Sequence, residues 1–338
     1  MKLKFISIIL LIFVCMGCDH KQKIAEFATQ ADRALENDNY ELAIKDYSEA
    51  IRLNPKYAAA YTARGDALMI LGENDKAMHD FSEAIQLNPN DYLAYELRGT
   101  VYYANQQFEK AINDLNFALK NESSNPKLLK SHGQAYKIRG LCYYWTYSFT
   151  NAIADLTEAA KYLPDDYEIY ERRGDCYDRR TDADKALNDF NKAIQLNSED
   201  WMSLYCRGSI YSHTGKYTNA IQDFEKTIQL EPQSRKANNL LAWLLATCPD
   251  DKIRNGKRAV DLATKVCEMS GWTNYAYVDT LAAAYAETGD FDQAVKYQKQ
   301  AASINSIPEG NRTNVENRVQ LYLQHKPYRE LKTYKVSN

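Results

Sequence analysis

Apolar, small and aromatic residues recur at fixed intervals along most of the chain, with polar residues between them. Segments such as YTARGDALMILGENDKAMHDFSEAIQLNP and YERRGDCYDRRTDADKALNDFNKAIQLN superimpose when they are aligned on their glycines. Consecutive glycines of this kind are 34, 41, 34 and 34 residues apart, and they are Gly65, Gly99, Gly140, Gly174 and Gly208. The spacing of 41 equals 34 with a seven-residue insertion near 126–132. A period of this length predicts a chain built from one repeated supersecondary unit.

Each unit carries the same residue types at the same offsets from its first residue. Position 4 is aromatic, position 8 is small, positions 20 and 27 are alanine, and position 32 is proline in most units. The alanines at position 20 are Ala43, Ala77, Ala111, Ala152, Ala186 and Ala220. The pattern resembles the tetratricopeptide repeat (TPR), a helix–turn–helix unit of 34 residues.

The resemblance implies an all-α fold, a superhelical solenoid of about eight helix–turn–helix repeats closed by a C-terminal capping helix. Small residues let two antiparallel helices approach closely, and proline ends the second helix because its ring cannot continue the hydrogen-bond ladder. A single unit cannot bury its apolar face alone, so the units stack. Six regular units span 24–233, two diverged units span 234–307, and a capping helix with a tail spans 308–338.

The N-terminus has the pattern of an export signal. Two lysines precede a continuous apolar run over 5–14, which is too short for a bilayer span of about 20 residues. The CMGC that follows resembles the lipobox of bacterial lipoproteins, in which a small residue precedes a lipidated cysteine. We therefore expect 1–18 to be a signal peptide that ends at lipidated Cys18, with 19–23 as a short tether. An ordinary secreted protein and an uncleaved anchor remain alternatives.

Composition and charge narrow the class of partner. The chain has 42 basic and 45 acidic residues, a net charge of −3, and no block of like charge. Nothing in this balance predicts a nucleic-acid surface or a polybasic membrane arm. The chain has 26 tyrosines, which is unusually many. This number suggests that tyrosine recurs at a fixed position of a repeat.

No motif of catalytic or metal-binding residues stands out in the sequence. There is no phosphate-binding loop, no nucleophile elbow and no zinc-protease motif, and the five histidines are scattered. We therefore expect no enzyme activity, no cofactor and no metal site. Cys142 and Cys176 share position 10 of their units, where other units have small apolar residues, so a buried hydrophobe is the expected role. We predict no disulfide between Cys248 and Cys267.

Two Arg-Gly-Asp tripeptides, at 64–66 and 173–175, fall at positions 7 to 9 of their units. Positions inside a helix are unsuited to the exposed loop of an adhesion signal. Arginine recurs at position 7 and aspartate at position 23, which suggests ion pairs between consecutive units, each arginine meeting the aspartate of the unit before it. These pairs would join Arg64, Arg98, Arg139, Arg173 and Arg207 to Asp46, Asp80, Asp114, Asp155 and Asp189. Simple solvation of both residues at the edge of the array is the alternative.

The resemblance also implies a binding groove lined by positions 2, 5, 9, 12 and 13 of each first helix. Carried over, these positions place large aromatic side chains at expected exposed sites, the residue types enriched at binding anchors. They also place four carboxylates on the first helix of the fifth unit. The candidate groove residues are Tyr103, Tyr144, Trp145, Glu168, Glu171, Asp175, Asp178 and Tyr205. An acidic groove of this kind suits a basic or amine-bearing partner segment, although the same charges also suit a face that only meets water.

The sequence thus predicts a non-enzymatic scaffold or adaptor of the bacterial cell envelope, exported and lipid-anchored, which binds a partner protein or peptide in its groove. A carbohydrate or small-ligand binding lipoprotein that uses the groove aromatics is the main alternative. A thiol-based enzyme is the third class.

Overall fold

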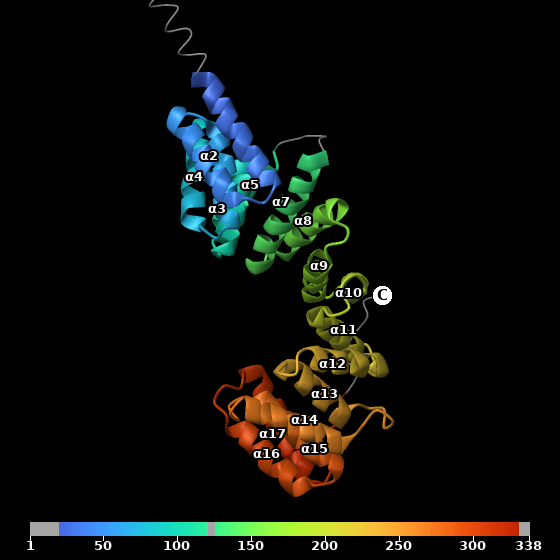
Figure 1. The fold of residues 1–338 in the computed structure, drawn as a ribbon. Coiled ribbons are helices and arrows are strands. Elements are labelled where there is room, and N and C mark those ends of the chain that lie inside the picture. The colour runs from blue at the N-terminus through green and yellow to red at the C-terminus, as the bar shows by residue number, and fades with distance from the viewer. Residues whose placement is uncertain (1–19, 121–125, 331–338) are drawn as a thin grey trace, which may run out of the picture. The chain divides into compact units, whose positions relative to one another are not determined.

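The fold was taken from a computed structural model, which describes residues 20–120 and 126–330. The predicted signal peptide, including Cys18, lies outside the described residues. Within them every regular element is a helix (Figure 1), so the all-α prediction is confirmed. Residues 20–36 are helical, and the helices that follow are α2 (Tyr40–Leu53), α3 (Ala58–Ile70), α4 (Asn74–Leu87), α5 (Tyr92–Ala104), α6 (Phe108–Ala118), α7 (Pro126–Trp145), α8 (Phe149–Tyr162), α9 (Tyr167–Arg179), α10 (Ala183–Leu196), α11 (Trp201–His213), α12 (Tyr217–Leu230), α13 (Arg235–Thr247), α14 (Gly256–Met269), α15 (Tyr275–Thr288), α16 (Phe291–Ser303) and α17 (Glu309–Leu323).

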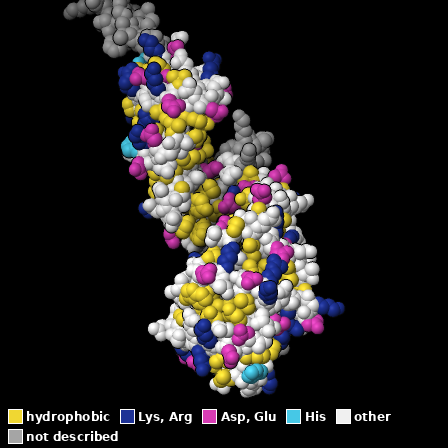
Figure 2. Space-filling model, turned by 60° about the horizontal axis from the view of Figure 1, so that its bottom comes forward, with side chains coloured by type: hydrophobic (Ala, Val, Ile, Leu, Met, Phe, Trp, Pro, Cys, Tyr) yellow, Lys and Arg dark blue, Asp and Glu magenta, His cyan; other side chains and the backbone are white. Residues whose placement is uncertain are grey.

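The described residues form two compact units, one up to Asp165 and one from Asp166 onward. We refer to them as the N-terminal unit and the C-terminal unit. In each, consecutive helices pair as the first and second helix of a repeat, for example α3 with α4 and α9 with α10. Charged side chains of both signs are interspersed over the face drawn in Figure 2, as expected for a chain of small net charge.

Short polar side chains begin many of the helices. Each accepts a hydrogen bond from a backbone N–H of the first turn, which would otherwise lack a partner. The residues that cap in this way are Asn39, Asp91, Asp166, Asp182, Asp200, Ser234, Asn255, Asn274 and Asp290. The aspartates and asparagines between repeats therefore set where the first helices start.

The residues of the predicted insertion form the N-terminal turns of α7. This helix has 20 residues, whereas α3, α5, α9 and α11 have 13 each. An insertion of seven residues adds about two helical turns, so the residues that follow keep their angular position on the helix. The face of α7 that packs on α8 is therefore the face that its counterparts use.

Glycine at position 8 allows the two helices of a repeat to meet. In the second repeat, a β-carbon on Gly65 would lie 2.6 Å from Cε1 of Phe81, a ring that is fully buried. The fifth repeat has the same arrangement, where a β-carbon on Gly174 would lie 2.9 Å from the Phe190 ring. Packing of this density leaves no room for a methyl group unless the aromatic ring moves.

Replacing Gly65 with alanine is therefore expected to destabilise the protein by about 1–3 kcal/mol through overpacking against Phe81. Gly310 in α17 provides the matched control, since a β-carbon there would meet nothing within 4 Å. Gly310 is the exposed second residue of α17, so alanine there should change the stability by no more than about 0.5 kcal/mol, as surface substitutions usually do. Chemical denaturation of both variants measures the two effects, and equal effects of the same sign would contradict the packing argument.

Arginine at position 7 pairs with aspartate at position 23 of its own repeat. Arg64 Nε lies 2.7 Å from Asp80 Oδ2, and the same contact recurs with similar distances in four further repeats. These are Arg98–Asp114, Arg139–Asp155, Arg173–Asp189 and Arg207–Asp223. The prediction of pairs between consecutive repeats is therefore wrong. In an antiparallel helix pair with its turn near position 15, positions 7 and 23 are equally far from the turn and lie at the same height.

Four of these arginines, Arg64, Arg98, Arg139 and Arg207, also reach the preceding repeat through a second nitrogen. Nη1 of Arg64 donates to the Ser48 hydroxyl at 3.0 Å, and Nη1 of Arg207 donates to the Asn191 amide oxygen at 2.7 Å. Arg98 and Arg139 donate in the same way to the residues at position 25 of the repeats before them. Each arginine thus joins a charged partner within its repeat to a neutral partner in the repeat before it.

Tyrosine at position 4 lies beside this arginine one helical turn away. The Arg64 guanidinium is 5.5 Å from the centre of the Tyr61 ring, a cation–π distance. The pairs Arg98–Tyr95, Arg139–Tyr136 and Arg173–Tyr170 have closely similar distances. This recurring stack explains part of the high tyrosine content. Both Arg-Gly-Asp tripeptides lie inside helices, and the arginine of each forms an ion pair.

Candidate functional site

The predicted aromatic residues of the N-terminal unit lie near the ends of α5 and α7. Trp145 is 48% exposed, and its indole stacks on the Phe108 ring at 6.4 Å with an interplanar angle of 11°. Tyr103, Phe108 and Trp145 line a hollow of about 360 Å³, together with Gln106. Tyr144 is half-buried and contacts Trp145 edge-on at 5.2 Å. The structure thus gathers three of the predicted anchors into one aromatic cluster.

The expectation that all four aromatics are exposed is wrong. Tyr205 in the C-terminal unit is half-buried, and its ring lies 6.5 Å from that of Phe224 in a core cluster. Burial raises the pKa of the Tyr205 phenol to about 12. Tyr103 is also half-buried and packs on Phe108 at 6.1 Å. Trp145 is the one predicted anchor of the four that is exposed.

The carboxylates predicted on the first helix of the fifth repeat differ from one another in their surroundings. Glu171 is only 7% exposed, so it does not belong to an acidic surface. Glu168, Asp175 and Asp178 are half-buried, and Asp175 forms an ion pair with Arg179 at 2.9 Å. Burial also raises the pKa of the Asp178 carboxyl. The predicted face of four carboxylates is therefore a face of three, each partly withdrawn from water.

Glu171 occupies a position that elsewhere carries a hydroxyl. In the second repeat, the position-5 residue Thr62 donates its hydroxyl to Oδ2 of Asp91, the cap of the next repeat, at 2.7 Å. In the fifth repeat, position 5 is Glu171 and the equivalent cap is Asp200, whose buried Oδ2 has no hydrogen-bond partner among the described residues. Burial raises the pKa of Glu171 to about 7, against the opposing effect of the Arg172 guanidinium 3.4 Å from its Oε1. A carboxyl group thus replaces a hydroxyl donor, and it can donate only when it is protonated.

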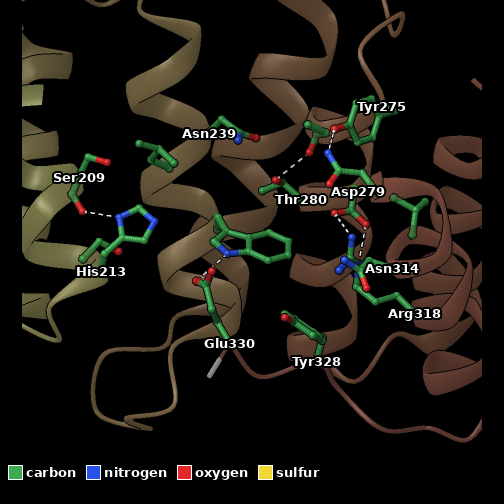
Figure 3. Close-up of a pocket in the computed structure, with 16 residues that line it drawn as sticks. Ser209, His213, Asn239, Tyr275, Asp279, Thr280, Asn314, Arg318, Tyr328 and Glu330 are labelled. Atoms are coloured by element: carbon green, nitrogen blue, oxygen red, sulfur yellow. Dashed lines mark hydrogen bonds and ion pairs between the residues drawn. The ribbon is translucent and has the colours of Figure 1, made fainter. Parts of the chain in front are cut away.

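A pocket of about 370 Å³ opens on the first helices of the C-terminal unit. Its walls come from α11, α13, α15 and α17, and from the extended segment that follows α17 (Figure 3). The polar groups around it are mainly hydroxyls, amides and one ion pair, and they include Ser209, His213, Asn239, Thr280 and Asn314. The pocket lies on the face that the resemblance assigned to the groove, because Ser209 and His213 are groove positions of the sixth repeat.

An ion pair forms the base of one wall of this pocket. Arg318 of α17 donates to both oxygens of Asp279 in α15, each at 2.8 Å, and Gln298 donates to Asp279 Oδ1 at 2.6 Å. The Arg318 guanidinium lies 5.7 Å from the Trp243 ring and 5.2 Å from the Tyr328 ring. The capping helix therefore holds a flat cation against two aromatic rings.

Residues 324–330 leave the end of α17 and cross the first-helix face of α13 and α15. The Trp243 indole N–H donates to the Glu330 carboxylate at 2.8 Å, and the Tyr328 ring lies 5.7 Å from the indole. Arg329 forms an ion pair with Glu287 at 2.5 Å. The backbone N–H of Glu330 donates to the Thr247 carbonyl at 2.9 Å. We call residues 324–330 the tail segment.

Sequence reasoning did not single out Trp243, Arg318 or the tail segment. Trp243 falls at position 9 of the seventh repeat if the count continues from Arg235, so the rule applied to units two to six would have placed it in the groove. Arg318 and the tail segment lie outside the repeat register, and no periodic signal points to them.

Metal-binding side chains are not gathered in the described residues. They hold no group of three or more His, Cys, Asp or Glu side chains placed to bind a metal ion. Cys142 and Cys176 are fully buried, as expected, and burial raises the pKa of each thiol to about 12. The thiols of Cys248 and Cys267 are both buried and free. No helix between residues 20 and 330 is long and apolar enough to cross a bilayer.

Two sequence profiles, both described as tetratricopeptide repeat, match the chain over more than half of its length. One matches residues 29–92 and 148–201, and the other matches 203–234 and 278–307. No curated protein matches the chain.

Solved structures resemble the chain in fold. One is pilF of Pseudomonas aeruginosa, which is 14% identical over 66% of this chain and 99% of that one, with a TM-score of 0.55. A tetratricopeptide repeat protein from Parabacteroides merdae is 17% identical over 89% and 99% of the two chains, with a TM-score of 0.47. YrrB, described as a TPR protein with an unusual peptide-binding site, is 21% identical over 56% and 95%, with a TM-score of 0.49.

Proposed function

Since the chain belongs to the tetratricopeptide repeat family, we propose that it is a non-enzymatic scaffold of the bacterial cell envelope that binds an extended segment of a partner protein. Members of this family generally mediate protein–protein interaction. The tail segment is the observation that supports the proposal most directly. It is an extended chain seated on the first helices of two repeats through aromatic, ionic and backbone contacts. The same face can therefore hold an extended protein segment.

The proposed position in the cell rests on the N-terminal sequence. A lipid on Cys18 would hold the repeats next to a membrane, because few residues separate Cys18 from the helix at 20–36. Replacing Cys18 with alanine is expected to move the protein from the membrane fraction to the soluble fraction, and to abolish labelling by a radioactive fatty acid. A variant that stays in the membrane fraction without the label would indicate an uncleaved anchor instead.

The chemistry of the first helix of the fifth repeat suggests a partner with basic side chains. Glu168, Asp175 and Asp178 share this helix, and in the same unit Asp178 lies near the His213 side chain at the pocket. A basic segment that crosses α9 and α11 would meet these carboxylates. The basic character of the partner is thus proposed from these three carboxylates.

Site-specific photocrosslinking in native membranes tests the proposed function. A photoreactive residue at position 209, on the first-helix face of α11, is expected to capture the partner. The same residue at position 222, on the exposed side of α12, is the matched control. Capture at position 209 should fall when Asp175 and Asp178 are changed to asparagine. Equal capture at both positions, or none, would count against binding on the first-helix face.

Carbohydrate binding is a second candidate, favoured by the exposed indole of Trp145 beside an aromatic hollow. A planar ring open on one side can stack on a sugar. A saccharide that binds the wild type, and is lost when Trp145 is changed to alanine in a folded protein, would support this function. A screen in which no saccharide binds the wild type would remove it.

A further inference from the structure

We propose that the tail segment stands in for the partner, and that the partner presents an extended segment in which an aromatic ring is followed by arginine and a carboxylate. The inference rests on the proposed function and names the chemistry of the segment that the groove accepts. It also implies that the partner must displace the tail segment before it can bind α13 and α15.

Three consecutive side chains of the tail segment contact Trp243, Arg318 and Glu287. The Tyr328 ring lies 5.7 Å from the Trp243 ring and 5.2 Å from the Arg318 guanidinium. Figure 3 shows Tyr328 and Arg318 on the same side of the pocket. Arg329 pairs with Glu287 near the end of α15. Glu330 accepts the Trp243 indole N–H.

The receptors for these side chains are themselves held in place. Asp279 fixes Arg318 through two hydrogen bonds, and Arg254 donates to the other oxygen of Glu287 at 2.9 Å. A receptor that is fixed in advance loses little conformational entropy on binding, which favours recognition of a defined pattern. The surface therefore recognises side-chain chemistry in a set order.

The attachment of the tail segment is suited to exchange. Residues 327–330 are half-buried and 324–326 are exposed, so the segment adds little to the fully buried core. A single backbone hydrogen bond between described residues, from Glu330 to Thr247, ties it to a first helix. Its other polar contacts involve charged groups, which a competing segment of the same chemistry could satisfy equally.

Tethering gives the tail segment an advantage over any segment in solution. A group held on a short linker experiences an effective concentration in the millimolar range. A free copy of the same sequence should therefore bind the wild-type protein weakly, and bind much more tightly once the tethered copy is detached. This difference separates an exchangeable stand-in from a fixed structural strap.

The test uses a fluorescent synthetic peptide, QHKPYRE, which reproduces residues 324–330. In the full-length protein, Arg329→Glu places a carboxylate opposite Glu287 and releases the tethered copy while leaving Tyr328 intact. We expect the peptide to bind this variant at least tenfold more tightly than it binds the wild type, by fluorescence anisotropy. The peptide QHKPAEE should bind neither protein. Adding Trp243→Phe, which keeps a ring but removes the N–H donor, should weaken binding by about tenfold.

Equal affinity for the wild type and the released variant, or no binding to either, would overturn the inference. Circular dichroism must show that Arg329→Glu keeps its helical content, and Glu330→Gln serves as a second, milder releasing variant. Photocrosslinking at position 209 reports on the proposed function independently. Partner capture without peptide binding would remove the inference and keep the function. Peptide binding without partner capture would show only that the tail segment can exchange, and would remove the proposed function and the inference together.

Discussion

Replacing Asp155 with alanine is expected to lower the free energy of unfolding by about 3–5 kcal/mol, the cost of leaving a largely buried charge without its partner. The side chains of Asp155 and Arg139 are 9% and 16% exposed, and two hydrogen bonds of 2.7 and 2.8 Å join them. The loss should appear in urea denaturation monitored by circular dichroism.

A double-mutant cycle decides which aspartate is the partner of Arg139. Arg139→Ala and Asp155→Ala should show a coupling energy above about 1 kcal/mol. Once one residue of the pair is gone, replacing the other costs less, because their interaction is already lost. Arg139→Ala with Asp114→Ala should be additive within about 0.5 kcal/mol, because Asp114 pairs with Arg98. A stronger coupling to Asp114 would instead support ion pairs between consecutive repeats.

Raising the pH from 5 to 8 is expected to destabilise the protein. Glu171→Gln is expected to remove much of this pH dependence from the C-terminal unit. Burial raises the pKa of Glu171 from 4.5 to about 7, so the folded state holds its proton more tightly than the unfolded chain does. The stabilisation is complete below pH 4.5 and is lost as the pH rises through 7. At pH 8 the raised pKa corresponds to a free energy of unfolding about 3 kcal/mol lower than at a pH where Glu171 is protonated in both states.

Thermal melts of the wild type and of Glu171→Gln at intervals of half a pH unit measure this effect. The melting temperature of the wild type should fall between pH 5 and pH 8, and that of the variant should fall less. Glu96 also has a pKa raised by burial to about 7, and it accepts a hydrogen bond from Ser131 in the N-terminal unit. The slope that remains in the variant is expected to fall further when Glu96→Gln is added. Parallel curves for wild type and single variant would show that Glu171 is ionised when folded.

The repeat architecture was predictable because its determinants are local and periodic. Glycine at position 8 and alanine at positions 20 and 27 are the residues that close helix packing requires, and the structure buries the alanines completely in most repeats. The aspartates that precede the first helices act as caps, a role that depends on a few neighbouring residues. Patterns of this kind are visible in a single sequence.

The site was predicted less well, because exposure depends on neighbours in space. Position 5 carries threonine, glutamate, lysine or tyrosine in repeats two to six, and the sequence alone did not reveal that Glu171 would be buried near Asp200. The arginine partner was predicted in the preceding repeat, whereas positions 7 and 23 meet at the same height within one helix pair. The tail segment contacts residues more than 80 positions earlier, and no periodicity predicts such a contact.

The separations along the chain also suggest an order of folding. Each arginine–aspartate pair closes a loop of 16 residues, whereas the contact between Trp243 and Glu330 closes one of 87. The longer closure costs about 1.5 kcal/mol more in chain entropy, and contacts between nearby residues generally form sooner. The helical hairpins should therefore assemble first and the tail segment should dock last, onto a surface that is already complete. On unfolding, the same segment should detach before any repeat opens, and its amide protons should exchange first.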